Sequence, residues 1–194
     1  DMLALLHTEP ARVRAHLLRC AARQFEAGDV LHWWHEPATG VRTRICDDLL
    51  FLPWVAAAYV KHTGDGAILD EVIPYLEDVE IPEGQEDVYK EMKAGNAVES
   101  LHGHCMRAFR HAARTGSHGL LLMGTGDWND GMDRVGAAGR GESVWLSQFA
   151  VACAGAYREI APVEADAAWL EALSRRLRIA LEVHGWDGNW YLDT

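Results

Sequence analysis

A glycine-rich turn over residues 124–134 carries the side chains best suited to chemistry. Its sequence, GTGDWNDGMDR, places the indole of Trp128 among three carboxylates, an amide and a guanidinium group. Unpaired polar groups cost about 1–3 kcal/mol each inside a core, so this mixture suits a ligand better than a core. A pyranose ring has apolar C–H faces that stack on tryptophan and hydroxyl groups that pair with Asp, Asn and Arg. The turn therefore predicts a sugar site.

The carboxylates of this turn are candidates for acid catalysis. Asp127, Asp130 and Asp133 would share one face of a helix, but the neighbouring glycines favour a turn. Like charges held close together raise the pKa of one carboxyl group, as a general acid working near neutral pH requires. We select Asp130, which follows Asn129 and precedes a flexible glycine, as the acid. Asp127 is either a second site residue or an Asx residue that caps the loop, and Asp133 pairs with Arg134 on the surface.

A second polar segment, residues 32–48, joins the pattern HWWHEP to the pattern RTRICDD. Trp33 and Trp34 either stack on a sugar or pack at its rim. Glu99 is either the acidic member of a helix-capping box with Asn96 or a further site carboxylate. We expect the 32–48 segment and the 124–134 turn to meet across one pocket shaped for a hexose.

The charge balance excludes several classes of partner. The 194 residues include 29 acidic and 18 basic ones, which gives a formal net charge of −11, so nucleic acid and anionic lipid are not expected ligands. The longest apolar run, residues 49–60, is shorter than the roughly 20 residues of a bilayer span. The four cysteines form no Cys-x-x-Cys pair and are expected as reduced thiols, which favours the cytoplasm.

No metal site is expected either. His102 and His104 are the only histidines separated by two positions on an expected helix, and their spacing fits no zinc motif. We expect both of them on the helix surface.

Apolar residues recur with a helical period along most of the chain. The expected helices cover residues 9–27, 47–63, 68–76, 96–115, 145–160 and 169–184. Residues 77–95 and 116–141 are expected as loops, and no segment predicts a strand. Two helices end in Thr-Gly, 52 residues apart, which suggests a repeated helical hairpin. The expected fold class is therefore all-α, with hairpins stacked in a bundle, a solenoid or a toroid.

Five segments together resemble glycoside hydrolase family 94, with the closest likeness to its β-1,2-glucan branch. They are WWH at 33–35, GVRTRI at 40–45, DDLL at 47–50, GDWNDGM at 126–132 and GRGESVWL at 139–146. The resemblance implies that residues 1–194 form part of a single (α/α)6 toroid built from helical hairpins. It also implies inverting phosphorolysis of a β-glucosidic bond, which releases α-glucose 1-phosphate.

The resemblance assigns roles to particular residues. Asp130 matches the general acid of the family, and Trp128 lines the sugar site beside it, with Asp127 and Asn129 in the same motif. Arg42 and Asp48 match residues that bind the glucosyl unit at subsite −1. Inorganic phosphate is the co-substrate and takes the place of an activated water, so no second catalytic carboxylate is needed. No other cofactor is expected. We add that Arg42 and Arg44 help to neutralise the phosphate.

The chain also departs from the family pattern. It contains about three expected hairpins instead of six, and the phosphate-binding His and Thr-Gly elements of the family are absent from it. We therefore expect a fragment that carries the acid and half of the sugar site, binds glucan oligosaccharides weakly, catalyses nothing by itself and self-associates through uncovered helix faces. It would belong to a cytoplasmic enzyme or to the cytoplasmic part of a membrane-bound synthase.

Two other functions remain open. An inverting, glucoamylase-like hydrolase would need a carboxylate to activate water, and Glu99 or Glu142 could supply it. A non-catalytic glucan-binding module would need neither an acid nor a base.

Overall fold

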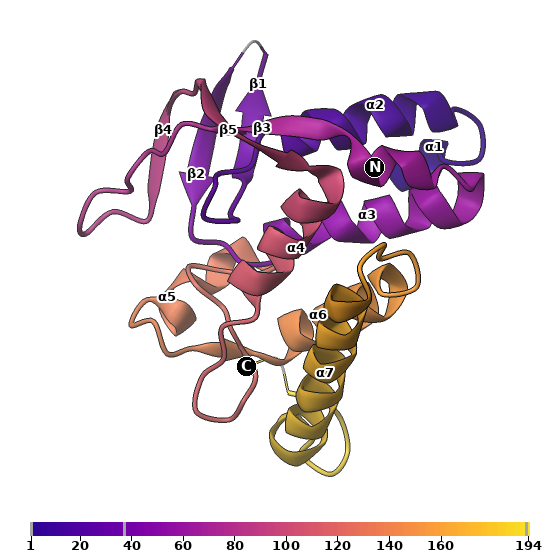
Figure 1. Ribbon diagram of the computed structural model, residues 1–194. Helices are drawn as coiled ribbons and strands as arrows, with labels where there is room; N and C mark the ends of the chain where they lie inside the picture. Colours follow the sequence, from indigo (N-terminus) through magenta and orange to yellow (C-terminus); the bar gives the residue numbers. More distant parts are fainter. Residues whose placement is uncertain (1, 37, 193) are drawn as a thin grey trace.

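Helices and short antiparallel sheets alternate along the chain (Figure 1). The computed structural model of the protein describes residues 2–36, 38–192 and 194, and for Asp130 it describes the backbone alone. The helices are α1 (Met2–Leu5), α2 (Pro10–Ala21), α3 (Asp48–Thr63), α4 (Leu101–Ala112), α5 (Asp133–Gly136), α6 (Val144–Tyr157) and α7 (Glu164–Ala180). Shorter turns of helix are η1 (Gly66–Asp70), η2 (Asp130–Met132) and the π-helical η3 (Leu181–Gly185). The strands are β1 (Leu31–His35), β2 (Thr39–Thr43), β3 (Val72–Leu76), β4 (Asp87–Glu91), β5 (Ala94–Ser100), β6 (Leu121–Leu122) and β7 (Glu142–Ser143).

The strands form three antiparallel sheets, with the orders β1-β2-β4, β3-β5 and β6-β7. The fold is therefore mixed α/β, and the prediction of an all-α toroid of helical hairpins is wrong. Each of these sheets pairs strands that are well separated in the sequence, as where Val41 of β2 lies opposite Tyr89 of β4. Such pairing leaves no local signal, and the polar residues of β4 and β5 show no run of β-branched side chains.

Three expected helices are shorter than predicted, because turns or strands take up the rest of each predicted range. α2 ends at Ala21 because the chain then turns, with a β-bridge between Gln24 and Val30. The helix expected over 68–76 stops at Asp70, where β3 follows. α4 begins only at Leu101, because the preceding residues form β5.

The N-cap of α4 is Ser100, and the predicted capping box of Asn96 and Glu99 does not form. The Ser100 hydroxyl accepts a hydrogen bond from the backbone N–H of Gly103 at 3.1 Å. By contrast, α3 begins and ends as predicted, with Gly64 in the left-handed conformation (φ 74°) at its end.

The main core lies where α3 contacts α2, α4 and α6, and α6 in turn packs on α7. Figure 1 shows α3 and α4 between the β1-β2-β4 sheet and the α6–α7 pair. A smaller apolar cluster of Phe25, Leu31, Leu76 and Met92 anchors the first sheet. Together these contacts fix the end of β2 and the start of α3. The RTRICDD segment runs from one to the other.

Both histidines of α4 are buried, so their predicted surface position is wrong. His102 contacts the Tyr157 hydroxyl (Nδ1–O 3.1 Å) and Asp166 (Nε2–O 3.0 Å). His104 contacts Gln24 (Nδ1–Oε1 2.7 Å) and the carbonyl of Ile73. Within the described part of the chain, no three side chains of metal-ligand type gather to hold an ion.

All four cysteines are free, as predicted. Burial raises the pKa of the Cys20 and Cys46 thiols to about 11. Across the described residues, we find no helix with the length and apolar character that a bilayer crossing needs.

Candidate functional site

The two predicted segments meet through their backbones, at a contact that we call the seam (residues 44–46 with 124–126). The N–H of Cys46 donates to the carbonyl of Gly126 at 3.1 Å, and the N–H of Thr125 donates to the carbonyl of Arg44 at 3.2 Å. Gly124 has φ 68°, and a Cβ atom there would lie 1.9 Å from the Arg44 carbonyl oxygen. Only glycine fits this position. The two segments therefore lie side by side, whereas the expected hexose-shaped pocket between them stays a prediction.

Asp127 holds the 124–134 turn in place. Its side chain is buried, and its carboxylate accepts the Ser143 hydroxyl at 2.6 Å and the Asn129 N–H at 3.1 Å. Ser143 is also the N-cap of α6, since its hydroxyl accepts the Leu146 N–H. Asn129 accepts the Gly131 N–H at 3.1 Å. Of the two interpretations of Asp127, the structure shows the contacts of the loop-capping one.

Asp130 is the first residue of η2, directly after Asn129. Its side chain lies outside the described part, so the general-acid assignment stays a prediction. The backbone path of the turn is nevertheless fixed on both sides of Asp130, by the Asx contact of Asn129 and by the Met132 N–H bonded to the Asn129 carbonyl.

The Asp48 carboxylate extends the site from the start of α3. Its Oδ2 lies 2.7 Å from Nδ1 of His32 on β1. The preceding Asp47 is 6% exposed. Burial, together with the negative charges of Asp48 and Asp127, raises the pKa of Asp47 to about 7. Sequence reasoning assigned Asp47 no role of its own within the RTRICDD segment, because its approach to Asp127 depends on the tertiary fold.

Arg42 is engaged by the protein itself. It forms two bonds to Asp29 (Nε–Oδ2 2.6 Å and Nη2–Oδ1 2.9 Å) and one to Asp78 (Nη1–Oδ1 2.7 Å). Its guanidinium carbon lies 3.9 Å from the centre of the Phe25 ring. Arg42 and Arg44 line a cavity of about 890 Å³ beside the seam. Asp48 and Trp128 are outside the lining of this cavity, so the structure joins the segments without placing all predicted sugar ligands in one pocket.

The three candidate tryptophans differ in their surroundings. Trp33 is 43% exposed, and its ring lies beside those of His35 and Tyr89. Trp128 is 59% exposed, and its ring centre is 6.2 Å from that of Trp145 in the first turn of α6. Trp34 is half-buried against the small apolar cluster of the first sheet, with the Arg23 guanidinium 5.0 Å from its ring centre. The exposed face of Trp128 is free to stack on a sugar, whereas Trp34 has the contacts of a packing residue.

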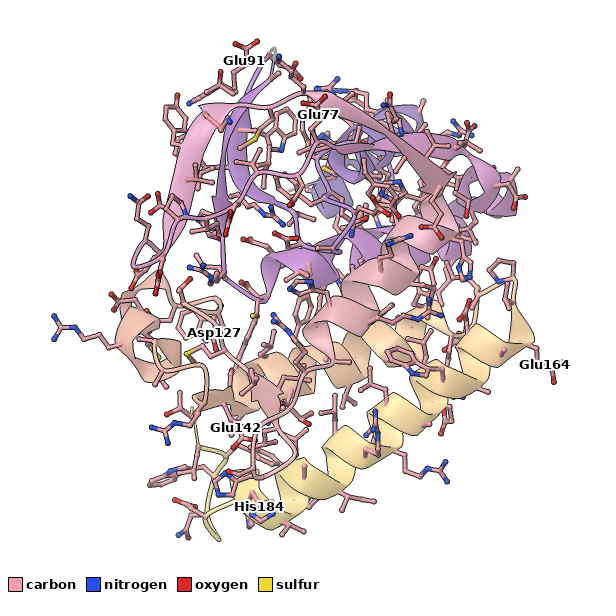
Figure 2. The ribbon with its side chains drawn as sticks, turned by 60° about the vertical axis from the view of Figure 1, so that its left-hand side comes forward. Glu77, Glu91, Asp127, Glu142, Glu164 and His184 are labelled. Carbon is pink, nitrogen blue, oxygen red and sulfur yellow. The ribbon has the colours of Figure 1, made fainter. Side chains whose placement is uncertain are left out.

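Glu99 and Glu142, the two candidates for a hydrolytic base, both accept hydrogen bonds from other groups of the protein. Glu142 is buried and accepts the Leu120 N–H and Nδ1 of His118, the latter at 2.6 Å. Figure 2 shows Glu142 below Asp127, on the side of the molecule that carries the turn. Glu99 accepts the Tyr75 hydroxyl and Nε of Arg107, each at 2.6 Å. These contacts hold neighbouring segments together.

Comparisons with known proteins show which family the chain is similar to. The whole chain, residues 1–194, matches the model of the glycosyl hydrolase 94 superfamily, catalytic domain. It is 44% identical to cyclic beta-(1,2)-glucan synthase NdvB of Rhizobium meliloti (strain 1021) over 98% of the chain. Two proteins of Paenibacillus borealis are also similar: solabiose phosphorylase, at 35% identity over 72% of the chain, and 3-O-beta-D-glucopyranosyl-beta-D-glucuronide phosphorylase, at 36% over 99%.

The chain spans only part of these relatives, namely 7%, 17% and 24% of their lengths in the same order. The family match nevertheless covers every residue of the chain, including both segments of the seam. The chain belongs to the glycosyl hydrolase 94 superfamily, within its catalytic domain.

Proposed function

We propose that the chain supplies the acid-bearing part of a phosphorylase site that acts on β-1,2-linked glucan, and that all of its 194 residues belong to one catalytic domain. The observation that carries this proposal is the seam, because it holds the segment of Arg42 and Asp48 against the turn of Trp128 and Asp130. The choice of a β-1,2-linkage is supported by the most similar named relative above, a cyclic β-(1,2)-glucan synthase.

The proposed chemistry needs one proton donor. Asp130 protonates the glycosidic oxygen of the leaving sugar, while Trp128 stacks on a pyranose face. Inorganic phosphate attacks the anomeric carbon from the opposite face, so the configuration inverts and α-glucose 1-phosphate forms. Phosphate is already a nucleophile, and a second carboxylate is therefore not required. Arg42 is already paired with Asp29 and Asp78. The cation that favours the approach of the anion to the seam is therefore Arg44, whose guanidinium donates to the neutral carbonyl of Gln85.

Two further properties belong to the same proposal. Four free thiols fit a reducing compartment, so we place the site in the cytoplasm. Exposed apolar side chains such as Phe51 and Ile179 lead us to expect self-association of the isolated chain.

The products formed with and without phosphate test the proposal. A protein that carries this chain within a complete family 94 catalytic domain is incubated with β-1,2-gluco-oligosaccharides in phosphate buffer and in phosphate-free buffer, and the products are followed by ³¹P and ¹H NMR. We expect α-glucose 1-phosphate in phosphate buffer and no product without phosphate. Free glucose formed at equal rates in both buffers would contradict the proposal and favour the hydrolase. Oligosaccharide binding with no product in either buffer would favour a glucan-binding module.

A further inference from the structure

Asp47 is a buried carboxyl group at the seam that the proposed chemistry leaves without a role. Its backbone carbonyl accepts the Leu50 N–H at 2.9 Å, at the start of α3. The residue before it, Cys46, donates its N–H to Gly126. The backbone of Asp47 is therefore held on one side by α3 and on the other by the 124–134 turn.

The elements packed around Asp47 bring mainly negative charge toward it. Asp48 comes from α3, and Asp127 comes from the turn; both lie close enough to disfavour the ionised form of Asp47. Two basic groups of the neighbouring elements contact other residues. His32 of β1 pairs with Asp48, and Arg114, just beyond α4, acts on the thiol of Cys46.

The three carboxyl groups differ in their donors. Asp127 accepts the Ser143 hydroxyl and the Asn129 N–H, and Asp48 is paired with His32. Asp47 receives only local backbone N–H groups, and no side chain in the described ranges donates to it. Negative charges held close together and away from water repel one another, which favours protonation of one of the three carboxyl groups. The group with the fewest hydrogen-bond donors, Asp47, is the one that gains most from a proton.

We propose that Asp47 is a positioning residue: it carries a proton at the seam, and this proton lets the Asp48 and Asp127 segments stay packed together while both of those carboxylates are ionised. The consequence for glucan binding rests on the function proposed above. When Asp47 loses its proton, a third negative charge enters the seam. The turn that bears Trp128 and Asp130 then separates from the start of α3.

The direction of the pH dependence follows from the elevated pKa of about 7. A carboxyl group whose pKa is higher in the folded protein contributes stability that is complete at acid pH, below the pKa of the unfolded chain. This contribution is lost as the pH rises through 7. Glucan affinity should fall over the same interval.

The test compares the wild-type chain with Asp47→Asn, which has the same shape and stays neutral, and with the exposed control Asp70→Asn. We expect the wild type and Asp70→Asn to lose at least fivefold in affinity for a β-1,2-gluco-oligosaccharide between pH 6 and pH 9, and Asp47→Asn to lose less than twofold. The urea midpoint of Asp47→Asn should exceed that of the wild type by a margin that grows from pH 5 to pH 8. The ¹³C carboxyl resonance of Asp47 should titrate near pH 7.

Two results would overturn the role of Asp47: a carboxyl resonance that titrates below pH 5, or an Asp47→Asn chain that is less stable than the wild type at pH 6. If the chain binds no glucan at any pH, the proposed function fails, but the NMR titration and the urea midpoints still decide the role of Asp47.

Discussion

Replacing Asp130 by asparagine is expected to slow phosphorolysis by about 10²–10⁴-fold, the usual contribution of a general acid. Asparagine keeps the size of the side chain but cannot release a proton to the glycosidic oxygen. The backbone of the turn should not move, because the Asn129 side chain and the Met132 N–H fix it on either side of this residue. Glucan binding should therefore persist in the variant while turnover is lost.

The matched control is Asp133→Asn, the same chemical change three residues later in the same turn, for which we expect no loss of rate. A second readout is the leaving group. An aryl glucoside whose phenolate leaves without protonation should react nearly as fast with Asp130→Asn as with the wild type. Equal losses for Asp130→Asn and Asp133→Asn, or an equal loss on both kinds of substrate, would remove Asp130 from the acid role.

Replacing Gly124 by alanine is expected to lower the free energy of unfolding by about 2–5 kcal/mol and to abolish glucan binding. The left-handed backbone conformation costs about 1–2 kcal/mol with any side chain. The new methyl group would also overlap the Arg44 carbonyl oxygen, and overpacking of this kind costs about 1–3 kcal/mol. Because the overlap lies at the seam, relief of the strain must separate the two segments. Urea denaturation and oligosaccharide titration measure the two effects.

Gly64→Ala separates these two contributions. Gly64 has a similar φ of 74°, but a Cβ atom there would meet nothing within 4 Å. This control should therefore show only the conformational cost, about 1–2 kcal/mol, and should bind glucan like the wild type. A Gly124→Ala chain no less stable than Gly64→Ala would show that the close approach at the seam does not constrain the site.

Local sequence signals predicted the parts of the fold that depend on local interactions. The start of α3 at Asp48 agrees with the prediction from acidic residues at a helix N-terminus, and its end agrees with the prediction from the left-handed Gly64. The turns of residues 116–141 follow from glycines with positive φ, such as Gly119 and Gly139, but the expectation of a loop over this whole range is wrong, because it contains β6, η2 and α5. By contrast, β2 pairs with β4 across a separation of more than 40 residues. Capping and periodicity depend on neighbouring residues, so they cannot predict such a distant partner. The same limit explains Ser100, whose capping role emerges only once β5 occupies the residues before it.

The candidate site shows the same division. The type of residue at positions 42, 48, 128 and 130 pointed to sugar chemistry from the sequence alone. The ion-pair partners of Arg42 could not be predicted from the sequence, because Asp29 and Asp78 approach it from other parts of the chain. The raised pKa that the sequence suggested for Asp130 is found in the described residues at Asp47, since burial and tertiary neighbours determine which carboxyl group retains its proton.

The most direct test of the central claim, that the seam presents a sugar site around Trp128, uses the indole N–H signals of the eight tryptophans. A ¹⁵N-labelled chain is titrated with a β-1,2-gluco-oligosaccharide, and the Trp128 signal is assigned from its loss in Trp128→Phe. We expect the Trp128 signal to shift with saturation, and Trp128→Phe to bind more weakly. Shifts confined to Trp186 and Trp190 near the end of the chain, with the Trp128 signal unchanged at saturation, would contradict the account.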